Sequence, residues 1–396
     1  MSGDVLCFSH LRWGFVFQRP NHLMSRCARE RRVFFIEEPF FDEELPRLES
    51  LPTEHGVTVV VPHLPPGTEP QDAERMQRTL FDAFVADNHV RDAVVWLYTA
   101  MALPISEHLR RTVTVYDCMD ELSGFHGAPS VLREREQALF AAADLVFTGG
   151  QSLYEAKRAH HPSVHAFPSS VDAEHFRQAR SATAADDPPD QRDIPHPRLG
   201  FFGVIDERLD LELLGGAAEL RPDLHFVVLG PVVKIDAALL PQRPNIHYLG
   251  GKKYAELPAY LGGWDVAIMP FALNAATRYI SPTKTLEYLA AGKPVVSTAI
   301  HDVVKPYGDA ELVRIAANAE EFVAAAQAAL DECGTPHGEK RRQACDAFVA
   351  TTSWDRTWAR LGALIRDAAS TRKTRPATID GMHNGLEGAS CSTISS

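Results

Sequence analysis

Short runs of β-branched and aromatic residues alternate with longer helical patterns along this 396-residue chain. Helical patterns such as RPNHLMSRCARE and VLREREQALFAAA stand between several of these runs. Strands that alternate with helices build βαβ units, in which helices cover both faces of a parallel sheet. The pattern therefore predicts an α/β fold, with a first series of strands at residues 4–8, 32–38, 57–62, 93–98, 112–117, 144–149 and 164–170.

The alternation stops once and then starts again. Residues 180–197, RSATAADDPPDQRDIPHP, are rich in Pro, Asp and Ala and have no periodicity, as is typical of a linker. After this segment the second series of strand-like runs occupies residues 198–205, 225–230, 246–250, 265–270, 294–298 and 312–316. The chain is long enough for two hydrophobic cores.

These patterns predict two α/β domains in series. The expected division is residues 1–180, a linker over 181–197, and residues 198–350. A helix over 351–369 is expected to close the fold by packing back toward the first domain. The polar tail over 370–396 is expected to be disordered. Ligands of parallel-sheet domains bind beyond the carboxyl ends of the strands, so two such domains can share a ligand across a cleft.

Charge and cysteine content restrict the possible partners. The net charge of −12 argues against nucleic acid, which requires a basic face, so an anionic ligand would need a local cationic site. The six cysteines form no C-x-x-C pair, which predicts reduced thiols in a cytoplasmic protein. The N-terminal MSGDVLCFSH has no signal-peptide pattern, and no segment approaches the ~20 apolar residues that span a bilayer.

The segment SPTKTLEYLAAGKPVVST, residues 281–298, predicts a helix that could bind phosphate. Ser281 suits the N-cap and Pro282 the first helical position, which predicts a helix over 282–291. Its free N–H groups, with Lys284, would stabilise a phosphate group, and Glu287 lies one turn beyond Thr283, within reach of a ribose. Alternatively, the segment is only a well-capped helix, and Glu287 is solvated.

This segment, with WDVAIMPF and NIHYLG before it, resembles the donor-binding region of retaining nucleotide-sugar glycosyltransferases of the family 4 type. WGFVFQRPNHLMSRCARERRVFFIEEP, VYDCMDELSGF and ADLVFTGGQSLYEAK resemble a subgroup from cell-surface polysaccharide synthesis, including teichuronic acid glycosyltransferases. The resemblance covers residues 4–366. It implies the GT-B fold, in which two Rossmann-like domains face each other across a cleft, and a UDP- or GDP-sugar donor without another cofactor.

The resemblance also implies roles for particular residues. The family has two glutamates separated by seven residues, and the second, which binds the donor ribose, matches Glu287. The first position is Tyr279 here, so the chain departs from the pattern at the residue that normally orients the sugar. The backbone around Arg278 to Ser281 would have to replace it.

The family holds the diphosphate with a glycine-containing loop after the first strand of the second domain. The matching loop is GFFGVIDERLD. Gly203 would let the protein backbone approach the ligand closely, and the Arg208 guanidinium would neutralise the charge of the diphosphate. Lys234 is a further candidate. Alternatively, Arg208 forms a surface ion pair with Glu207 or Asp210.

The implied reaction depends on stabilising the leaving diphosphate rather than on a protein nucleophile. Arg208, Lys284 and the start of the helix, with Ser281, Pro282 and Thr283, would act on charge that develops in the transition state. The chain shows no Asp-x-Asp motif near a strand end, so we expect no metal ion.

The first domain would bind the acceptor. Asp117, Asp120 and Glu121 follow a predicted strand, and Asp117 or Asp120 could orient the acceptor hydroxyl or the donor sugar. The alternative is a solvated acidic loop. His10, Arg12 and Trp13 follow the first strand and could form a lip over the donor, although His10 could equally be structural.

The acceptor is expected to be a glycan or a lipid-linked saccharide. Basic clusters at residues 29–32, 108–111 and 157–161 could contact anionic lipid at the inner membrane face, or could simply be solvated helix faces. Two other functions stay open: a nucleotide-sugar epimerase of the same fold, and a degenerate protein that binds the donor without turnover.

Overall fold

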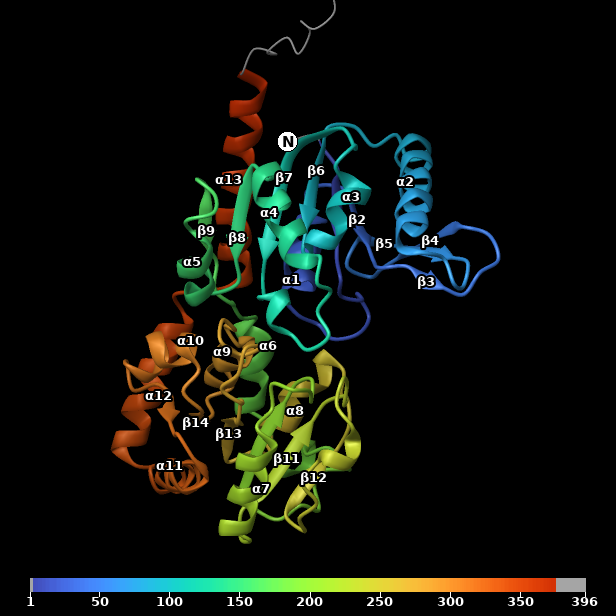
Figure 1. The fold of residues 1–396 in the computed structure, drawn as a ribbon. Helices are drawn as coiled ribbons and strands as arrows, with labels where there is room; N and C mark the ends of the chain where they lie inside the picture. The colour runs from blue at the N-terminus through green and yellow to red at the C-terminus, as the bar shows by residue number, and fades with distance from the viewer. Residues whose placement is uncertain (1–2, 375–396) are drawn as a thin grey trace, which may run out of the picture.

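The computed structural model describes residues 3–374, which form two α/β domains joined by two crossings of the chain (Figure 1). The predicted tail over 370–396 lies outside the described residues, except that residues 370–374 continue the last helix. Across the described chain, no helix combines the length and the apolar composition required to cross a bilayer.

The first domain contains a nine-stranded sheet in the order β3-β5-β2-β1-β6-β7-β8-β9, with β4 paired to the outer side of β5. Neighbouring strands are parallel except β4, which is antiparallel to β5. The strands are β1 (Val5–Phe8), β2 (Val33–Ile36), β3 (Phe40–Phe41), β4 (Arg47–Pro52), β5 (Val57–Leu64), β6 (Ala93–Leu97), β7 (Arg111–Cys118), β8 (Leu145–Thr148) and β9 (Val164–Ala166). The sequence analysis missed β3 and β4, because β3 has two residues and β4 is a polar, largely exposed edge strand.

Helices cover both faces of this sheet. The side chains of β1 alternate between the two cores, since Leu6 and Phe8 pack on one face and Val5 and Cys7 on the other. The helices of this domain are α1 (Arg19–Cys27), α2 (Pro70–Asp87), α3 (Leu103–Ser106), α4 (Leu132–Ala142) and α5 (Gln151–Lys157).

The second domain has a parallel sheet in the order β12-β11-β10-β13-β14-β15, so the strand order reverses between β10 and β13. This reversal is where doubly wound sheets bind ligands. Its strands are β10 (Arg198–Phe202), β11 (His225–Leu229), β12 (Ile246–Tyr248), β13 (Val266–Met269), β14 (Val295–Ser297) and β15 (Arg314–Ile315). Its helices are α7 (Leu211–Leu220), α8 (Leu257–Gly262), α9 (Thr283–Ala290), α10 (His301–Val303), α11 (Ala319–Asp331) and α12 (Pro336–Val349).

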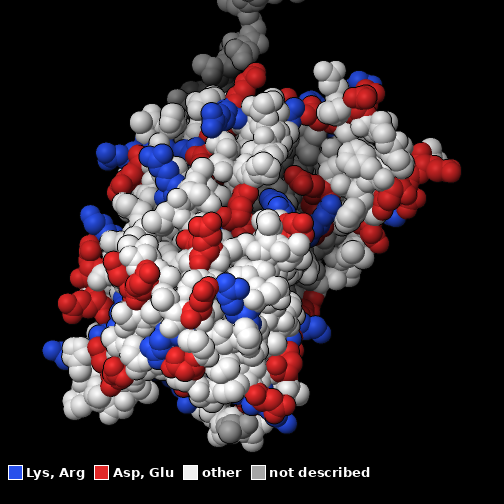
Figure 2. Space-filling model, turned by 60° about the horizontal axis from the view of Figure 1, so that its bottom comes forward, with Lys and Arg blue, Asp and Glu red and all other residues white. Residues whose placement is uncertain are grey.

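Acidic and basic side chains are interspersed on the face shown in Figure 2. Two cations of the basic clusters predicted to contact lipid are held by carboxylates. Arg32 pairs with Asp4 at 2.6 Å, and Lys157 is buried between Glu121 and Glu136, at 2.7 and 2.8 Å. These cationic groups are therefore not arranged as a free basic surface.

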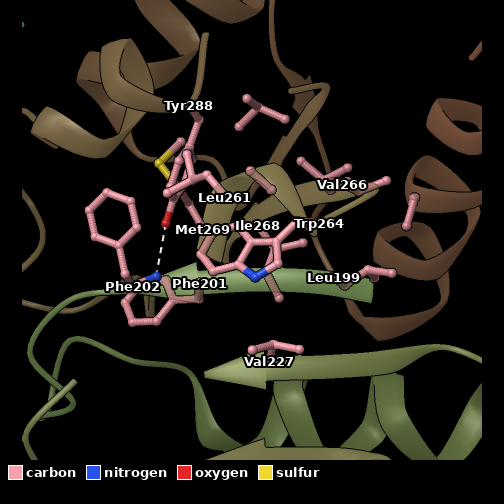
Figure 3. Packing of buried hydrophobic residues seen from close by; sticks show 14 of the residues in the cluster. Leu199, Phe201, Phe202, Val227, Leu261, Trp264, Val266, Ile268, Met269 and Tyr288 are labelled. Carbon is pink, nitrogen blue, oxygen red and sulfur yellow. Dashed lines mark hydrogen bonds between the residues drawn. The ribbon is translucent and has the colours of Figure 1, made fainter. Parts of the chain in front are cut away.

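The core of the second domain is built around Trp264 (Figure 3). A Cβ atom at Gly200 would lie 1.8 Å from the Trp264 ring, so β10 needs glycine there for the indole to pack. The backbone N–H of Phe202 donates to the Tyr288 hydroxyl at 3.1 Å, which ties β10 to α9. The indole N–H of Trp264 donates to Gln191 at 2.8 Å.

The predicted linker is therefore packed on the second domain. Gln191 is fully buried, and Arg198 forms an ion pair with Asp187 at 2.5 Å. The segment over 173–180, which the sequence analysis assigned to the first domain, also packs on the second: α6 (Ala173–Arg177) contacts α9, and Phe176 belongs to the second core. The chain thus crosses between domains before residue 173.

The last helix, α13 (Trp354–Thr374), returns to the first domain (Figure 1). Trp354, Trp358, Leu361 and Ile365 pack in the core that contains β1 and β7. Two polar contacts also join the domains near the cleft. The Ser169 hydroxyl donates to the Ser281 carbonyl oxygen at 2.5 Å, and the Ser152 N–H donates to Asp302 at 3.0 Å.

Candidate functional site

The start of α9 lies at the interface between the domains. The helix runs from Thr283 to Ala290, one residue shorter at each end than predicted. Pro282 occupies the N-cap position, and the Ser281 side chain does not cap the helix. Instead, the Ser281 hydroxyl accepts from the Ser169 N–H at 3.4 Å. The prediction that Ser281 is the N-cap was therefore wrong, because a contact with the other domain uses its polar groups.

Gly203 follows β10 and directly contacts Lys284. It has φ +147°, and a Cβ atom there would lie 2.3 Å from Cε of Lys284. The next strand ends in a second glycine, Gly230, whose added Cβ would lie 1.7 Å from the Gly203 carbonyl oxygen. The absence of side chains at these two positions brings the ends of β10 and β11 together beside the start of α9.

Lys284 and Glu287 form an electrostatically linked pair on α9. The Lys284 ammonium lies 5.7 Å from the Phe201 ring centre and 5.9 Å from that of Phe271. Burial lowers the pKa of Lys284, and attraction to Glu287 opposes this shift. Burial raises the pKa of Glu287, and Lys284 and a hydrogen bond from Thr283 oppose that shift. Glu287 is only 5% exposed, so it is not a solvated surface carboxylate.

Tyr254, which the sequence analysis missed, lies beside Glu287. Burial raises the pKa of Tyr254, and the charge of Glu287 raises it further. Its ring stacks on His175 at 4.3 Å and lies 4.7 Å from Phe17 of the first domain. Its hydroxyl is buried and finds no partner among residues 3–374. The only signal in the sequence is its position in the loop after β12, on the carboxyl edge of the sheet.

Arg208 is held by Asp206 rather than by Glu207 or Asp210. Its Nε and Nη2 atoms donate to the two carboxylate oxygens of Asp206 at 2.9 and 2.7 Å. Asp206 is 3% exposed, while the Arg208 side chain keeps 26% of its surface accessible. The bidentate pair fixes the direction of the guanidinium and leaves part of it free to bind an anion.

Asp120 brings the acidic loop of the first domain to these cations. Its carboxylate has no hydrogen-bond partner within residues 3–374. Burial raises the pKa of Asp120, and the charges of Arg208 and Arg19 oppose this shift. Asp120 also acts on the pKa of Lys284. Asp120 of one domain and Arg208 and Lys284 of the other therefore share one electrostatic site.

Asp117 does not belong to this site. It is fully buried within β7, and Arg19 binds it through Nε and Nη2 at 3.1 and 2.9 Å. A third donor of Arg19, Nη1, bonds the Phe167 carbonyl oxygen at 2.7 Å. The prediction that Asp117 stands in the loop after the strand was wrong, because it lies inside β7, buried in an ion pair with Arg19. The pair ties β7 to α1, and Arg19 in turn holds the residue that follows β9.

Phe125 of the acidic loop reaches the second domain and lies between two of the predicted phosphate ligands. Its ring centre is 5.6 Å from the Arg208 guanidinium and 5.3 Å from the Lys234 ammonium. The His126 N–H donates to Glu207 at 3.1 Å, which adds a polar contact. The loop after β7 thus closes over the cationic groups of the second domain.

His10 lies at the same edge of the cleft as Lys234. Burial lowers the pKa of His10 to about 4, and the charge of Lys234 lowers it as well. Lys234 also opposes the burial-induced rise in the pKa of Glu38. His10 is therefore a neutral side chain near neutral pH, and its role at the lip of the donor site stays a prediction.

Arg12 and Trp13 instead stabilise the loop after β1. Arg12 pairs with Glu37 at 3.0 Å and lies 3.9 Å from the Phe40 ring centre. The Trp13 N–H donates to Glu37 at 2.7 Å, and its ring packs edge-on against Phe35 at 5.1 Å. Their groups hold this loop to β2 and the residue after it, and a role over the donor stays a prediction.

A cavity of about 720 Å³ opens between the domains next to this site. Its wall in the first domain is formed by Glu121, Ser123, Gly124 and Arg133, and the opposite wall by residues 273–275, 277–279 and 299–301. Tyr279 lines it and packs against the core of the first domain. In the part of the chain described, no group of three or more His, Cys, Asp or Glu side chains could hold a metal ion.

Comparison with known proteins agrees with this arrangement. Residues 196–332 match the family described as glycosyl transferases group 1. This segment is therefore similar to a group 1 glycosyltransferase domain. It contains Gly203, Arg208, Lys284 and Glu287, and hence the cationic side of the cleft.

A curated relative extends the similarity. Over 216 residues the chain is 30% identical to a putative teichuronic acid biosynthesis glycosyltransferase, TuaH, of Bacillus subtilis (strain 168). The alignment covers 49% of this chain and 53% of the relative, so the match spans about half of each protein.

Solved structures share the whole two-domain architecture. Sucrose-phosphate synthase from Thermosynechococcus elongatus superposes with a TM-score of 0.70 at 14% identity, over 93% of this chain and 100% of that one. Anabaena HepE, in complex with UDP and glucose, has a TM-score of 0.63 at 14% identity, over 92% and 99%. The predicted GT-B fold is confirmed.

Proposed function

We propose that the chain is a glycosyltransferase that moves a sugar from a nucleoside diphosphate sugar to a glycan or lipid-linked acceptor in cell-surface polysaccharide synthesis. The observation that carries the proposal is the electrostatic interaction of Asp120 in one domain with Arg208 and Lys284 in the other. The group 1 domain, the relative named for teichuronic acid biosynthesis, and the HepE complex with UDP and glucose support it.

The donor diphosphate would lie at the start of α9. Gly203 leaves room for the Lys284 side chain, and Lys284 and the free N–H groups of the first helical turn supply positive charge. Glu287 would accept hydrogen bonds from the two ribose hydroxyls one turn further along. Its proximity to the unpartnered Tyr254 hydroxyl makes Tyr254 a second candidate contact for the nucleoside.

The reaction would retain the configuration of the sugar. The bond between the sugar carbon and the diphosphate oxygen breaks, and the acceptor oxygen forms its bond on the same face. The acceptor proton passes to the departing phosphate oxygen. Arg208 and Lys284 stabilise the negative charge that accumulates on that oxygen, so the two cations supply the role that a metal ion would otherwise have.

Asp120 is the candidate residue on the acceptor side. Its free carboxylate faces the positive groups and could orient the acceptor hydroxyl or stabilise positive charge on the sugar in the transition state. Asp117 has no such role, because it is buried in an ion pair.

We propose a cytoplasmic site of action, without membrane contact through the predicted basic clusters. Arg29 and Arg32 pair with Asp355 and Asp4, and Lys157 is buried against two glutamates. A lipid-linked acceptor would therefore be recognised through its saccharide rather than through these side chains.

Incubation with UDP- and GDP-sugars and a mixture of saccharide acceptors tests the proposal. We expect release of nucleoside diphosphate that depends on acceptor and is lost in Asp120→Asn. Conversion of the sugar nucleotide to an epimer would indicate the epimerase alternative, and binding without turnover would indicate a degenerate protein. An exposed acid of the second domain, Glu320, provides the control variant Glu320→Ala.

A further inference from the structure

Two arginine side chains that the proposed function does not use line the cavity of about 720 Å³ between the domains. Arg133 enters from the first turn of α4, and Arg278 from the loop before α9. Both side chains are exposed. Within residues 3–374 neither guanidinium has an ion-pair partner. The Arg278 guanidinium lies 5.2 Å from the centre of the Tyr279 ring.

This freedom is unusual in and around the cleft. The neighbouring arginines are held by carboxylates: Arg19 by Asp117 at 2.9 Å and Arg208 by Asp206 at 2.7 Å. In a protein with a net charge of −12, unpaired cations that share one cavity wall are the groups available for an anion.

The acidic residue of the cavity does not cancel this charge. Glu121 is paired with Lys157 at 2.7 Å and accepts from the Ser123 hydroxyl at 2.7 Å. His301, on the opposite wall, contacts Asp302 at 3.1 Å, and Asp302 in turn accepts from the Ser152 N–H. The carboxylates near the cavity are thus already engaged, and the two arginines are not.

The loop that carries Arg278 is rigidly built. The Asn274 side-chain oxygen accepts from the N–H groups of Ala276 and Thr277 at 3.0 and 3.1 Å. Thr277 is 1% exposed, and its hydroxyl donates to the Ala272 carbonyl oxygen. Tyr279, on the other side, packs against the first domain. Arg278 is therefore presented from a fixed backbone, which reduces the entropy lost on binding a ligand.

We propose that this cavity binds a carboxylate or phosphate group carried by a saccharide reactant, and that Arg133 and Arg278 determine specificity for it. The inference rests on the proposed function, since the cavity lies beside the site assigned to the donor phosphates. A guanidinium matches the geometry of both anions through paired N–H donors. The anion belongs either to the transferred sugar, as in a uronic acid, or to the acceptor.

The test compares charged and neutral saccharides by calorimetric titration of the full chain. In the donor arm, UDP-glucuronate is compared with UDP-glucose. In the acceptor arm, glucose 6-phosphate and glucuronate are compared with glucose, with and without saturating UDP. We expect an anionic saccharide to bind roughly tenfold or more tightly than its neutral counterpart in at least one arm. The arm that shows the preference identifies the reactant that carries the anion.

The arginine variants assign the preference to the cavity. Arg133→Gln and Arg278→Gln should each weaken it, and the double variant should abolish it while leaving UDP affinity unchanged. Arg158→Gln, at an exposed position after α5, is the matched control and should keep it. Equal affinity for charged and neutral saccharides in both arms, or a preference that survives in the double variant, would overturn the inference. Failure of UDP to bind would contradict the donor assignment, whereas the arm without UDP still tests the cavity.

Discussion

Lys284 occupies the space that a side chain at position 203 would need. The distance of 2.3 Å between a Cβ built on Gly203 and Cε of Lys284 leaves no room for both. The lysine at the start of α9 can therefore pack here only because the residue after β10 is glycine, although 81 positions separate the two in the sequence. Their relation explains how a lysine at the start of α9 fits against the end of β10.

Gly203→Ala should therefore displace the Lys284 ammonium. The added methyl group also meets a backbone with φ +147°, which costs about 1–2 kcal/mol in the free energy of unfolding. We expect weaker binding of UDP or GDP together with this modest loss of stability. Calorimetric titration and urea unfolding measure the two effects.

Gly334→Ala is the matched control. Gly334 also has positive φ, +74°, but a Cβ there has nothing within 4 Å. It should lower stability without affecting nucleotide affinity. If both variants bind nucleotide equally well, the steric link between Gly203 and Lys284 has no role in donor binding.

Glu287→Ala should weaken nucleotide binding by roughly tenfold or more, because the ribose hydroxyls lose a charged acceptor. The exposed Glu320→Ala should have no effect. Glu287→Gln keeps the shape of the side chain and can still accept one hydrogen bond, so its loss should be smaller. Unchanged affinity in Glu287→Ala would contradict the ribose assignment.

The same residue should make binding depend on pH. Burial raises the pKa of Glu287. The folded state therefore holds this proton more tightly than the unfolded chain. Stability from this group is present below the usual glutamate pKa of about 4.3 and declines as pH rises toward neutrality. Nucleotide affinity should rise over the same range as the carboxylate forms. Both dependences, measured by thermal unfolding and titration, should flatten in Glu287→Gln.

The sequence predicted the architecture because the relevant signals are local. Thirteen strand-like runs, from β1 to β15 without β3 and β4, reflect residues that are apolar over a continuous stretch. The helix at α9 was predicted within one residue at each end from its own pattern. Lys284 and Glu287 were singled out from the helix pattern, and Gly203 and Arg208 from the family resemblance; their roles stay predictions.

Contacts between distant segments could not be predicted in this way. Ser281 suits an N-cap, but its hydroxyl and carbonyl oxygens accept hydrogen bonds from Ser169 of the other domain. Asp117 follows an apolar run, but nothing in the sequence places Arg19 against it, 98 positions away. Phe125 resembles any loop aromatic until the fold brings Arg208 and Lys234 to its ring.

Arg208 should act more on turnover than on affinity, but a direct deletion has a second effect. Arg208→Ala would leave Asp206, which is 3% exposed, without its partner. Breaking such a pair costs roughly 3 kcal/mol in the free energy of unfolding. The reaction is better tested in the double variant Asp206→Asn/Arg208→Gln, which removes both charges and can keep a hydrogen bond.

Compared with Asp206→Asn alone, the double variant should lower kcat by about 100-fold or more and change donor affinity little. Such a loss is typical of removing a donor to charge that develops in the transition state. Arg243→Gln, which breaks an exposed pair with Glu219, should leave both constants unchanged. Equal losses in affinity and in kcat/KM would mean that Arg208 binds substrate and transition state alike.

Arg19 and Asp117 should matter for folding and not for the reaction. The side chains are 3% and 0% exposed, so Arg19→Ala would leave a carboxylate buried without a counterion. We expect a loss of about 3–5 kcal/mol in the free energy of unfolding. Arg29→Ala, which removes a 66% exposed partner of Asp355, should cost less than about 1 kcal/mol. Urea unfolding separates these values.

Nucleotide affinity per folded molecule should stay at the wild-type level, because the donor groups lie in the other domain. If Arg19→Ala were as stable as the wild type but had no turnover, Asp117 would be assigned to the catalytic site.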